Sequence, residues 1–508
     1  MKMKKLRKVV IVGGGTSGWL AANHIGKRLL GSDIEVCLIE SPTIPTIGVG
    51  EGTVPMMVST LQSFGISEQT FITQCDATFK QSIKFINWLD KHHHGEHNYY
   101  HHLFEYPFPN NQDVTQTWLS DTTTASFAET VSFQHMLCEH GVGPKAITQA
   151  QYTGHASYAY HLNALKFAQL LKDNATSRFN VKLLKTNVTA VKCNDEGHIS
   201  ELQTDDSGQV SGDFFVDCSG FSSILHRQAL GVKSVDVSAQ LPIDKAITAQ
   251  VPTSADDAIP PYTLATAHQA GWIWDIALTT RRGTGFVYAS DYLTKEQAYT
   301  KFERYLGQPL SGLKVREIDM KAGFAERAWH KNCVALGLAQ GFVEPLEATS
   351  ILLTDFSAKL LAENLPVQHH ALALAAKKYN EIVDYAWRRV VDFIQLHYYL
   401  SDRQDSAFWR AMKSTDSMSV VLKERLALWQ YQVPKKSDFN SKYEVFELEN
   451  YLYILYGMHF KPCAHLVAKA EHKELIAMLT SYGEQLLKQL PKHRALLNNI
   501  AQHGLQKI

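Results

Sequence analysis

A glycine-rich turn near the start of the chain constrains the fold more than any other feature. Gly13, Gly15 and Gly18 match the pattern GxGxxG, directly after the apolar, β-branched run Lys8–Val12 and before apolar residues at helical spacing. Glycines at these positions allow a tight turn, a close backbone approach to a pyrophosphate and close packing of helix on strand. The N-terminus of the following helix also favours an anion. The sequence therefore predicts a Rossmann-type βαβ unit that binds a dinucleotide.

The second strand of this unit is expected at residues 34–39 and ends at Glu40. An acidic residue at this point can accept hydrogen bonds from a ribose. A bare glycine turn without a ligand is the alternative, but the strand, the helix and the acid around it favour nucleotide binding. The fingerprint alone does not separate NAD from FAD.

Three further glycine-containing segments favour FAD, the longer cofactor. A loop at 47–55 follows the first unit, and two later strands end at 217–220 and 337–341. Several strand-end loops that converge on one ligand suit an extended dinucleotide. The residues expected to bind FAD are Gly13, Gly15, Thr16, Ser17, Gly18, Glu40, Gly50, Glu51, Gly52, Thr53, Val54, Asp217, Gly220, Leu338 and Gly341.

The rest of the pattern predicts an α/β, flavin monooxygenase-like fold with an antiparallel substrate-side sheet and a C-terminal helical cap. With 508 residues, 45% of them hydrophobic, the chain must bury a large core. Alternating apolar runs between about 240 and 330 indicate the antiparallel sheet. We expect an FAD-binding module over 1–365, with substrate-side excursions at about 60–155 and 235–330, and a mainly helical cap over 366–508.

Charge and cysteine usage exclude several classes of protein. Fifty Lys and Arg balance fifty Asp and Glu, so no basic field attracts nucleic acid or an anionic membrane. The seven cysteines are scattered without a CxxC pair, which argues against a disulfide framework or a zinc site and favours a reducing cytoplasm. No run of about 20 apolar residues could span a membrane. We expect a cytoplasmic protein with a small-molecule partner, and leave a homodimer open.

Several motifs together resemble the flavin-dependent tryptophan halogenases. The turn Gly-Gly-Gly-Thr-Ser-Gly-Trp at 13–19 resembles the family's GGGTAGW, and residues 272–277, Trp-Ile-Trp-Asp-Ile-Ala, resemble its WxWxIP signature. Residues 77–85 resemble the segment with the family's catalytic lysine, which maps to Lys80. Residues 345–350 resemble its PLESTG segment, which maps the catalytic glutamate to Glu347. The resemblance covers most of the chain and extends into the cap at His397 and Tyr398.

The chain departs from the family pattern at three positions. Ala277 stands where the signature has proline, Ala348 where the family has serine, and Ser350 where it has glycine. Loss of the proline frees a backbone N–H and relaxes φ without any need to move the tryptophans. A serine at 350 is compatible with halide binding by backbone N–H groups, unless that position requires a positive φ.

The resemblance implies a reaction in which reduced FAD, O2 and chloride or bromide give hypohalous acid. This acid then halogenates an electron-rich aromatic such as an indole or tryptophan. The Lys80 amine would hydrogen-bond the hypohalous acid or form an N-haloamine, and Glu347 would stabilise the ring cation and accept its proton. The amides of Thr349 and Ser350, at a helix N-terminus, suit the halide. Since no second dinucleotide fingerprint is present, we expect a separate NAD(P)H-dependent flavin reductase.

Four further residues are expected on the substrate side: Trp272, Trp274, His101 and Phe104. The two tryptophans share one face of a strand. The resemblance implies that they keep the organic substrate away from the flavin, whereas ordinary core packing is the alternative. His92, His93, His94, His97, His101 and His102 form a dense histidine cluster, which we interpret as a solvated loop that reaches the substrate pocket at 101–104, not as a metal site.

Two other functions remain open from the sequence. A single-component flavin-dependent hydroxylase would consume NAD(P)H directly and need no halide. A non-catalytic flavin-binding protein would need neither Lys80 nor Glu347, since neither residue is required merely to hold FAD.

Overall fold

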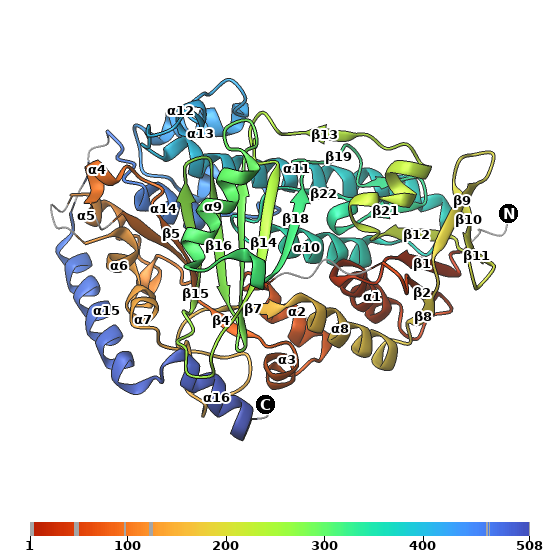
Figure 1. The fold of residues 1–508 in the computed structure, drawn as a ribbon, viewed down its shortest axis with the longest axis horizontal. Helices are drawn as coiled ribbons and strands as arrows, with labels where there is room; N and C mark the ends of the chain where they lie inside the picture. The colour runs from red at the N-terminus through yellow and green to blue at the C-terminus, as the bar shows by residue number, and fades with distance from the viewer. Residues whose placement is uncertain are drawn as a thin grey trace.

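The computed structural model describes residues 5–44, 50–95, 98–120, 125–463, 466 and 468–506. Its nucleotide-binding half is built on a six-stranded sheet that is parallel apart from one edge strand (Figure 1). In sheet order the strands are β20 (Trp329–His330), β21 (Cys333–Ala335), β12 (Phe214–Asp217), β1 (Lys8–Val12), β2 (Glu35–Glu40) and β8 (Lys182–Lys185). Helix α1 (Thr16–Leu29) connects β1 to β2, which confirms the predicted βαβ unit.

Both faces of this sheet are covered, and successive side chains of β1 pack into different hydrophobic clusters. Val9 and Ile11 belong to the main hydrophobic core, whereas Val10 and Val12 pack in a second cluster with Leu202. Successive side chains of a strand point to opposite faces, so a continuous apolar run suits a strand buried on both sides. On the main-core side, α1 packs against α8 (Ala164–Arg178) and α10 (Thr349–Asn364). The other side carries the antiparallel sheet of β9 (Val188–Cys193), β10 (Ile199–Thr204) and β11 (Gln209–Ser211).

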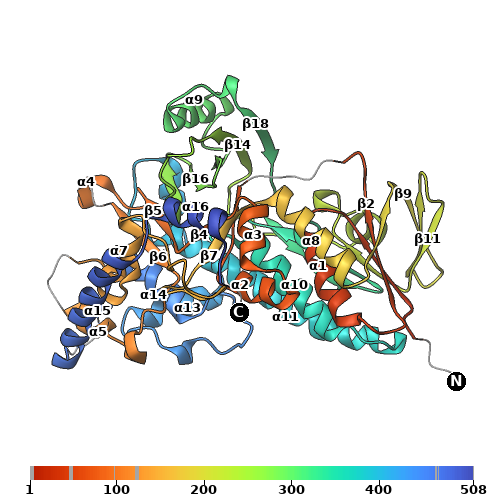
Figure 2. The ribbon, with the colours of Figure 1, turned by 90° about the horizontal axis from the view of Figure 1, so that it is seen from below.

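A seven-stranded sheet forms the second half of the molecule. Its order is β18 (Lys314–Asp319), β14 (Lys245–Pro252), β17 (Arg281–Tyr288), β16 (Gly271–Ala277), β15 (Tyr262–His268), β5 (Ser82–Ile86) and β6 (Tyr99–Leu103). All neighbours are antiparallel except β15 and β5. Strands from the two excursions expected at about 60–155 and 235–330 therefore lie in one sheet. Helix α9 (Lys295–Leu306) packs on β17 at its outer side (Figure 2).

A small three-stranded sheet connects these two halves. Strand β7 (Ala159–Asn163) lies between β3 (Gly50–Gly52) and β4 (Thr78–Lys80), antiparallel to both. Strand β3 also contacts β16 and β17, while β7 contacts α8 of the nucleotide-binding half. Another small sheet joins β13 (Ser234–Asp236), β19 (Gly323–Ala325) and β22 (Gly341–Phe342). The segments with Lys80 and with the 50–54 loop thus sit at the junction of the halves.

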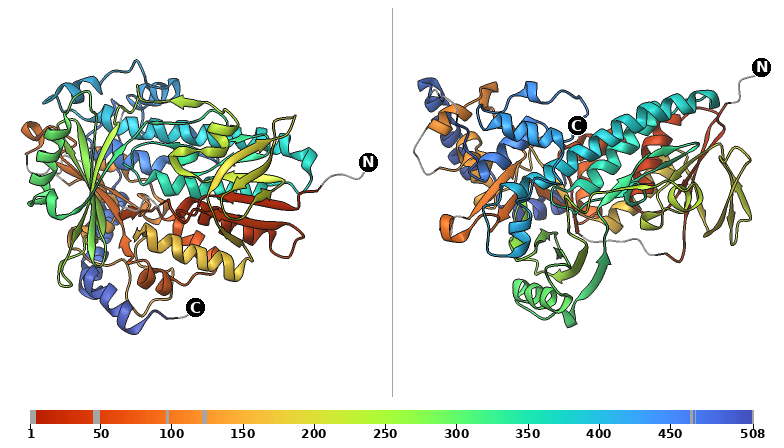
Figure 3. Two further views of the ribbon diagram at one scale, coloured as in Figure 1. Left: turned by 45° about the vertical axis from the view of Figure 1, so that its right-hand side comes forward. Right: turned by 90° about the horizontal axis from the view of Figure 1, so that it is seen from above.

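The C-terminal third is helical, as predicted. The long helix α11 (Leu372–Leu400) runs along the molecule, contacting β20 in the nucleotide-binding half and α14 (Leu448–Gly457) in the cap (Figure 3). The cap helices are α12 (Ala407–Ala411), α13 (Val420–Trp429), α14 (Leu448–Gly457), α15 (Ala470–Gln489) and α16 (His493–His503). Helix α14 packs on β6 and α6 (Phe127–Val131), and α15 packs along α7 (Gln134–Glu139) (Figure 2). Within the described ranges, no helix is long and apolar enough to cross a membrane.

Candidate active site

The glycine turn leaves no room for side chains at two of its predicted positions. Gly13 has φ +121°, and a Cβ there would lie 2.2 Å from the Cys218 carbonyl oxygen. A Cβ on Gly18 would lie 1.8 Å from the carbonyl oxygen of Gly13. Helix α1 begins at Thr16, directly after this turn, so its first N–H groups are available to an anion. This bare backbone cradle fits the pyrophosphate of a dinucleotide such as FAD.

Two other predicted loops meet at this turn. The loop after β12 contacts it through Cys218, and a Cβ on Gly337 would lie 2.1 Å from Oγ of Ser17. Glu40, at the end of β2, lies against the turn, since a Cβ on Gly14 would be 2.3 Å from its Cγ. The carboxylate of Glu40 forms an ion pair with Lys172, with 3.0 Å between Nζ and Oε1. Two of the three expected loops, those at 217–220 and 337–341, therefore lie at the turn, whereas the bond from Glu40 to a ribose stays a prediction.

Asp217 orders the loop that follows β12. Its Oδ1 accepts hydrogen bonds from the amide and hydroxyl of Ser219, and its Oδ2 accepts the amides of Leu225 and His226. These four bonds bend the chain sharply after the strand, where Gly220 has φ +70°. The structure thus gives Asp217 a local role in shaping the loop, and its contact with a cofactor stays a prediction.

A cavity of about 170 Å³ joins the nucleotide-binding half to the seven-stranded sheet. Its wall contains predicted residues of three different kinds: the flavin-side Glu51, Gly52 and Leu338, the lysine Lys80, and Trp274 and Ser350. Most of the remaining lining is apolar; part of it comes from the seven-stranded sheet, such as Ile276, Val287 and Ile318, and part from the segment before α10, such as Pro345 and Leu346. Glu51 is half-buried, and burial raises its pKa to about 7.

Lys80 ends β4 and is fully buried. Its Nζ donates a hydrogen bond to the Thr53 carbonyl oxygen at 3.0 Å, and lies 5.1 Å from the centroid of the Phe104 ring. Burial lowers its pKa to about 8, and attraction to the Glu347 carboxylate opposes this shift. The two residues predicted to be catalytic therefore attract each other electrostatically, although Lys80 and Glu347 are 267 positions apart in the sequence.

Glu347 lies on the segment between β22 and α10 and is held by two histidines. Nδ1 of His102 lies 3.0 Å from both carboxylate oxygens, and Nε2 of His397 lies 2.9 Å from Oε1. Burial by itself would raise the pKa of this carboxyl group. The charge and hydrogen bonds of His102 and His397 outweigh burial and lower the pKa to about 2. Glu347 is therefore a buried carboxylate that stays ionised at neutral pH.

The two neighbouring histidines of β6 have different partners. His101 is predicted to lie on the substrate side, but its ring nitrogens face Oγ of Ser82 at 2.9 Å and Oε1 of Glu139 at 2.8 Å. The neighbouring His102 is the one that reaches Glu347. Alternation along a strand places His102, not His101, on the face of Phe104. That rule could have identified His102, since Phe104 was already assigned to the substrate side.

Thr349 and Ser350, the residues expected to bind halide, begin α10. Thr349 is 1% exposed, and its Oγ1 has no hydrogen-bond partner among the residues that the structure describes. Ser350 lies in the cavity wall and has helical backbone geometry, so it does not need the positive φ that would have required glycine. The left-handed residue is Ala348, with φ +56°, at the N-cap of the helix. The serine in place of glycine is thus accommodated, and the left-handed conformation falls two residues earlier, at Ala348.

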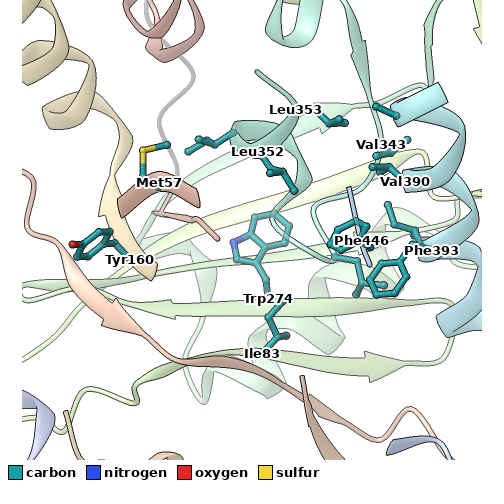
Figure 4. Close-up of a cluster of buried hydrophobic side chains, with 14 of the residues drawn as sticks. Met57, Ile83, Tyr160, Trp274, Val343, Leu352, Leu353, Val390, Phe393 and Phe446 are labelled. Atoms are coloured by element: carbon teal, nitrogen blue, oxygen red, sulfur yellow. The ribbon is translucent and has the colours of Figure 1, made fainter. Parts of the chain in front are cut away.

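The two tryptophans come from β16 and are both buried. Their ring centroids are 6.3 Å apart, and Trp274 forms part of the cavity wall. Figure 4 shows Trp274 among buried side chains from the seven-stranded sheet, α10 and α11. Its ring lies on Gly285, where a Cβ would be 2.1 Å from the indole. Ala277, which replaces the proline of the signature, is the last residue of the regular strand, and its carbonyl accepts the Thr78 hydroxyl.

The histidine cluster separates into two parts in the structure. His92, His93 and His94 form the short helix α4 (Lys91–His94), where His94 contacts Asp402 at 2.8 Å and stacks on His459. Within the described part of the chain, no group of three or more His, Cys, Asp or Glu could hold a metal ion. His97 lies outside the described residues.

Comparisons with known proteins agree with this geometry. The model of the tryptophan halogenase family matches residues 8–473. The tryptophan 6-halogenase SttH of Streptomyces toxytricini is 34% identical over 479 residues, which are 90% of each chain. The crystal structure of a tryptophan halogenase from Shewanella frigidimarina superposes with a TM-score of 0.94 at 37% identity, covering 99% of both chains. A flavin-dependent halogenase from Xanthomonas campestris superposes with a TM-score of 0.89 at 30% identity, covering 99% of this chain and all of that one. The chain belongs to the tryptophan halogenase family.

Proposed function

We propose that this protein is a flavin-dependent halogenase that uses reduced FAD, O2 and chloride or bromide to halogenate an electron-rich aromatic of the indole class. The observation that carries the proposal is the buried pair Lys80 and Glu347. They interact electrostatically, and Lys80 lies in a cavity wall shared with the loops that meet at the glycine turn. Neither residue is needed merely to bind a dinucleotide, so the pair favours catalysis over cofactor storage.

The division of labour follows from the chemistry of each group. Bound reduced FAD supplies, with O2, the oxidising power that turns halide into hypohalous acid. The Lys80 ammonium orients this acid by a hydrogen bond; in its neutral form the amine can instead form an N–X bond with release of water. Either way, a diffusing oxidant becomes one held in a fixed direction. The fixed direction is what makes the halogenation selective.

Glu347 acts on the other reactant. Attack of the arene on the halogen forms a C–X bond and leaves positive charge on the ring. A nearby carboxylate stabilises this cation and accepts the ring proton when the C–H bond breaks. The low pKa of Glu347 keeps it ionised and ready to do both. The two histidine donors and Lys80 offset the cost of holding this carboxylate in a buried site.

The substrate enters from the side of His102 and Phe104, and the tryptophans of β16 separate it from the flavin. Phe104 lies over the Lys80 amine, and His102 reaches Glu347, so an aromatic ring between them would contact both catalytic groups. An aromatic substrate also suits stacking on these rings. We expect reduced FAD to come from a separate NAD(P)H-dependent reductase.

A reconstituted assay tests the proposal. The purified protein is incubated with FAD, a flavin reductase, NADH, O2 and either halide over a panel of indoles that includes tryptophan, and products are identified by mass. Lys80→Ala should abolish halogenation while FAD still binds. Lys84→Ala is the matched control and should retain activity. The ammonium of Lys84 pairs with the carboxylate of Glu139, away from Glu347, with 2.6 Å between Nζ and Oε1. Hydroxylated products without halogenation, or no product with either halide, would contradict the proposal.

A further inference from the structure

Glu344 is a buried carboxyl group with an unusual set of partners. It lies three residues before Glu347, is 2% exposed, and its Oε1 accepts hydrogen bonds from the Tyr398 hydroxyl and from Nε1 of Trp272 at 3.3 Å. Its Oε2 has no hydrogen-bond partner among the described residues. Burial raises the pKa of this carboxyl to about 7, against the two hydrogen bonds.

Such a group is costly for the fold. Burying a carboxyl with one oxygen unpaired loses solvation that two neutral donors do not replace. An apolar residue of similar size would avoid this cost. The acid therefore has a reason other than stability to be here, and its partners indicate what that reason is.

Those partners connect three parts of the site. Trp272 stands on the same face of β16 as Trp274, whose ring forms the cavity wall. Tyr398 directly follows His397, the residue of α11 that binds Glu347. Glu344 and Glu347, on one short segment, are thus bound to consecutive residues of α11, and Glu344 also reaches across to the tryptophan strand.

We propose that Glu344 is a positioning residue for halogenation, which fixes the indole of Trp272, and with it the Trp274 wall, relative to the Glu347–His397 pair. The role rests on the proposed function, because it concerns the wall between substrate and flavin. Glu344 touches no reacting group. It acts through Trp272, so its loss should loosen the wall while Lys80 and Glu347 remain in place.

Three variants separate this role from a general loss of folding. Glu344→Met removes both acceptors at similar size, Glu344→Gln keeps an acceptor oxygen, and Trp272→Phe removes the indole N–H but keeps a ring. Asp275→Asn is the matched control. It changes a different buried carboxyl, which lies on β16, faces away from Trp272 and pairs with Arg282.

The first readout is the yield of halogenated product per reduced FAD consumed, measured in the reconstituted assay with bromide. We expect Glu344→Met and Trp272→Phe each to lower this yield by about tenfold. Their combination should add little, because both remove the same hydrogen bond between Glu344 and Trp272. Glu344→Gln should restore at least about half of the yield. Asp275→Asn should leave the yield unchanged.

The second readout needs no activity. The protein is labelled with 5-fluorotryptophan, and the 19F resonance of Trp272 is assigned by its loss in Trp272→Phe. Glu344→Met should shift or broaden this resonance and Glu344→Gln should restore it.

An unshifted resonance with wild-type yield in Glu344→Met, or a Gln variant as impaired as Met, would overturn the proposal. If Glu344→Met does not fold, the Gln variant and Trp272→Phe decide by the same two measurements. A wild-type protein that makes no halogenated product would refute the proposed function, while the 19F result would still report on the Glu344–Trp272 bond.

Discussion

His397 and Glu347, 50 positions apart in the sequence, meet in the buried centre of the protein with 2.9 Å between Nε2 and Oε1. The other ring nitrogen of His397 lies 2.8 Å from the Phe393 carbonyl oxygen, which can only accept. Both ring nitrogens of His397 therefore face oxygen atoms, and the imidazole bridges the α11 backbone and the carboxylate. The Glu347 carboxylate is thus held by a histidine donor that the backbone of α11 fixes in place.

Loss of this donor should create a new acid limb in the pH dependence of halogenation. In the wild type, Glu347 has a pKa of about 2 and stays ionised throughout the working range. In His397→Leu, burial is opposed by fewer donors, so the pKa of Glu347 rises. Activity should then fall as pH falls through this raised pKa, with a rate at neutral pH lower by about tenfold or more. His397→Gln, which keeps a donor, should show a weaker limb; a flat kcat profile between pH values of about 5.5 and 8 in the Leu variant would contradict the assignment.

Residues near one another in sequence could be assigned from the sequence, and contacts over long separations could not. The turn at Gly13–Gly18, the strand ending at Glu40 and the alternation of Trp272 and Trp274 follow from local periodicity, and the structure has them as predicted. No local pattern places His397 beside Glu347, or Trp272 beside Glu344, because those contacts depend on how α11 and the seven-stranded sheet pack. Lys80 and Glu347 were paired only through the family resemblance.

The sequence did not distinguish His101 from His102 for a different reason. The residues 101 and 102 are both histidine, so composition does not distinguish them, and the strand β6 that assigns their faces was interpreted as a loop. Once the strand is known, its two-residue period places His102 and Phe104 on one side. Without the strand, the sequence does not show that His102 and not His101 is the histidine that reaches Glu347.

Replacement of Lys80 by methionine should stabilise the protein in a pH-dependent way. The pKa of Lys80 is about 8 in the folded protein against 10.5 for an ordinary lysine. Between these values the unfolded chain binds more protons, so the free energy of unfolding of the wild type rises with pH. Below pH 8 the buried charge costs about 3 kcal/mol. The Tm of Lys80→Met should therefore exceed that of the wild type at pH 7, and the gap should narrow as pH rises from 8 towards 10.5; a gap independent of pH would contradict the buried ammonium.

The wall formed by Trp274 can be tested through the glycine beneath it. A Cβ at 285 would lie 2.1 Å from the indole, so Gly285→Ala must displace the ring. Overpacking of this kind costs about 1–3 kcal/mol, which a protein of this size can tolerate. We expect less halogenated product and the appearance of hydroxylated product, since the substrate could then reach the flavin side. Product masses for Gly285→Ala and Trp274→Ala, compared with the wild type, check this; unchanged halogenation with no hydroxylated product in either would remove the role.

The hydroxyl of Thr349 should matter for halide and not for stability. Its Oγ1 is buried without a partner in the described part of the chain, next to the free amides that begin α10. Thr349→Val keeps the shape of the side chain but removes the hydroxyl. The apparent KM for bromide should therefore rise by about tenfold, which corresponds to the free energy of one hydrogen bond to an anion. Because no protein bond is lost, the Tm should be unchanged or higher. Thr349→Ser keeps the hydroxyl and should retain the wild-type KM. A large fall in Tm with an unaltered bromide KM in the Val variant would mean that the hydroxyl serves the fold, and the halide would then depend on the backbone N–H groups alone.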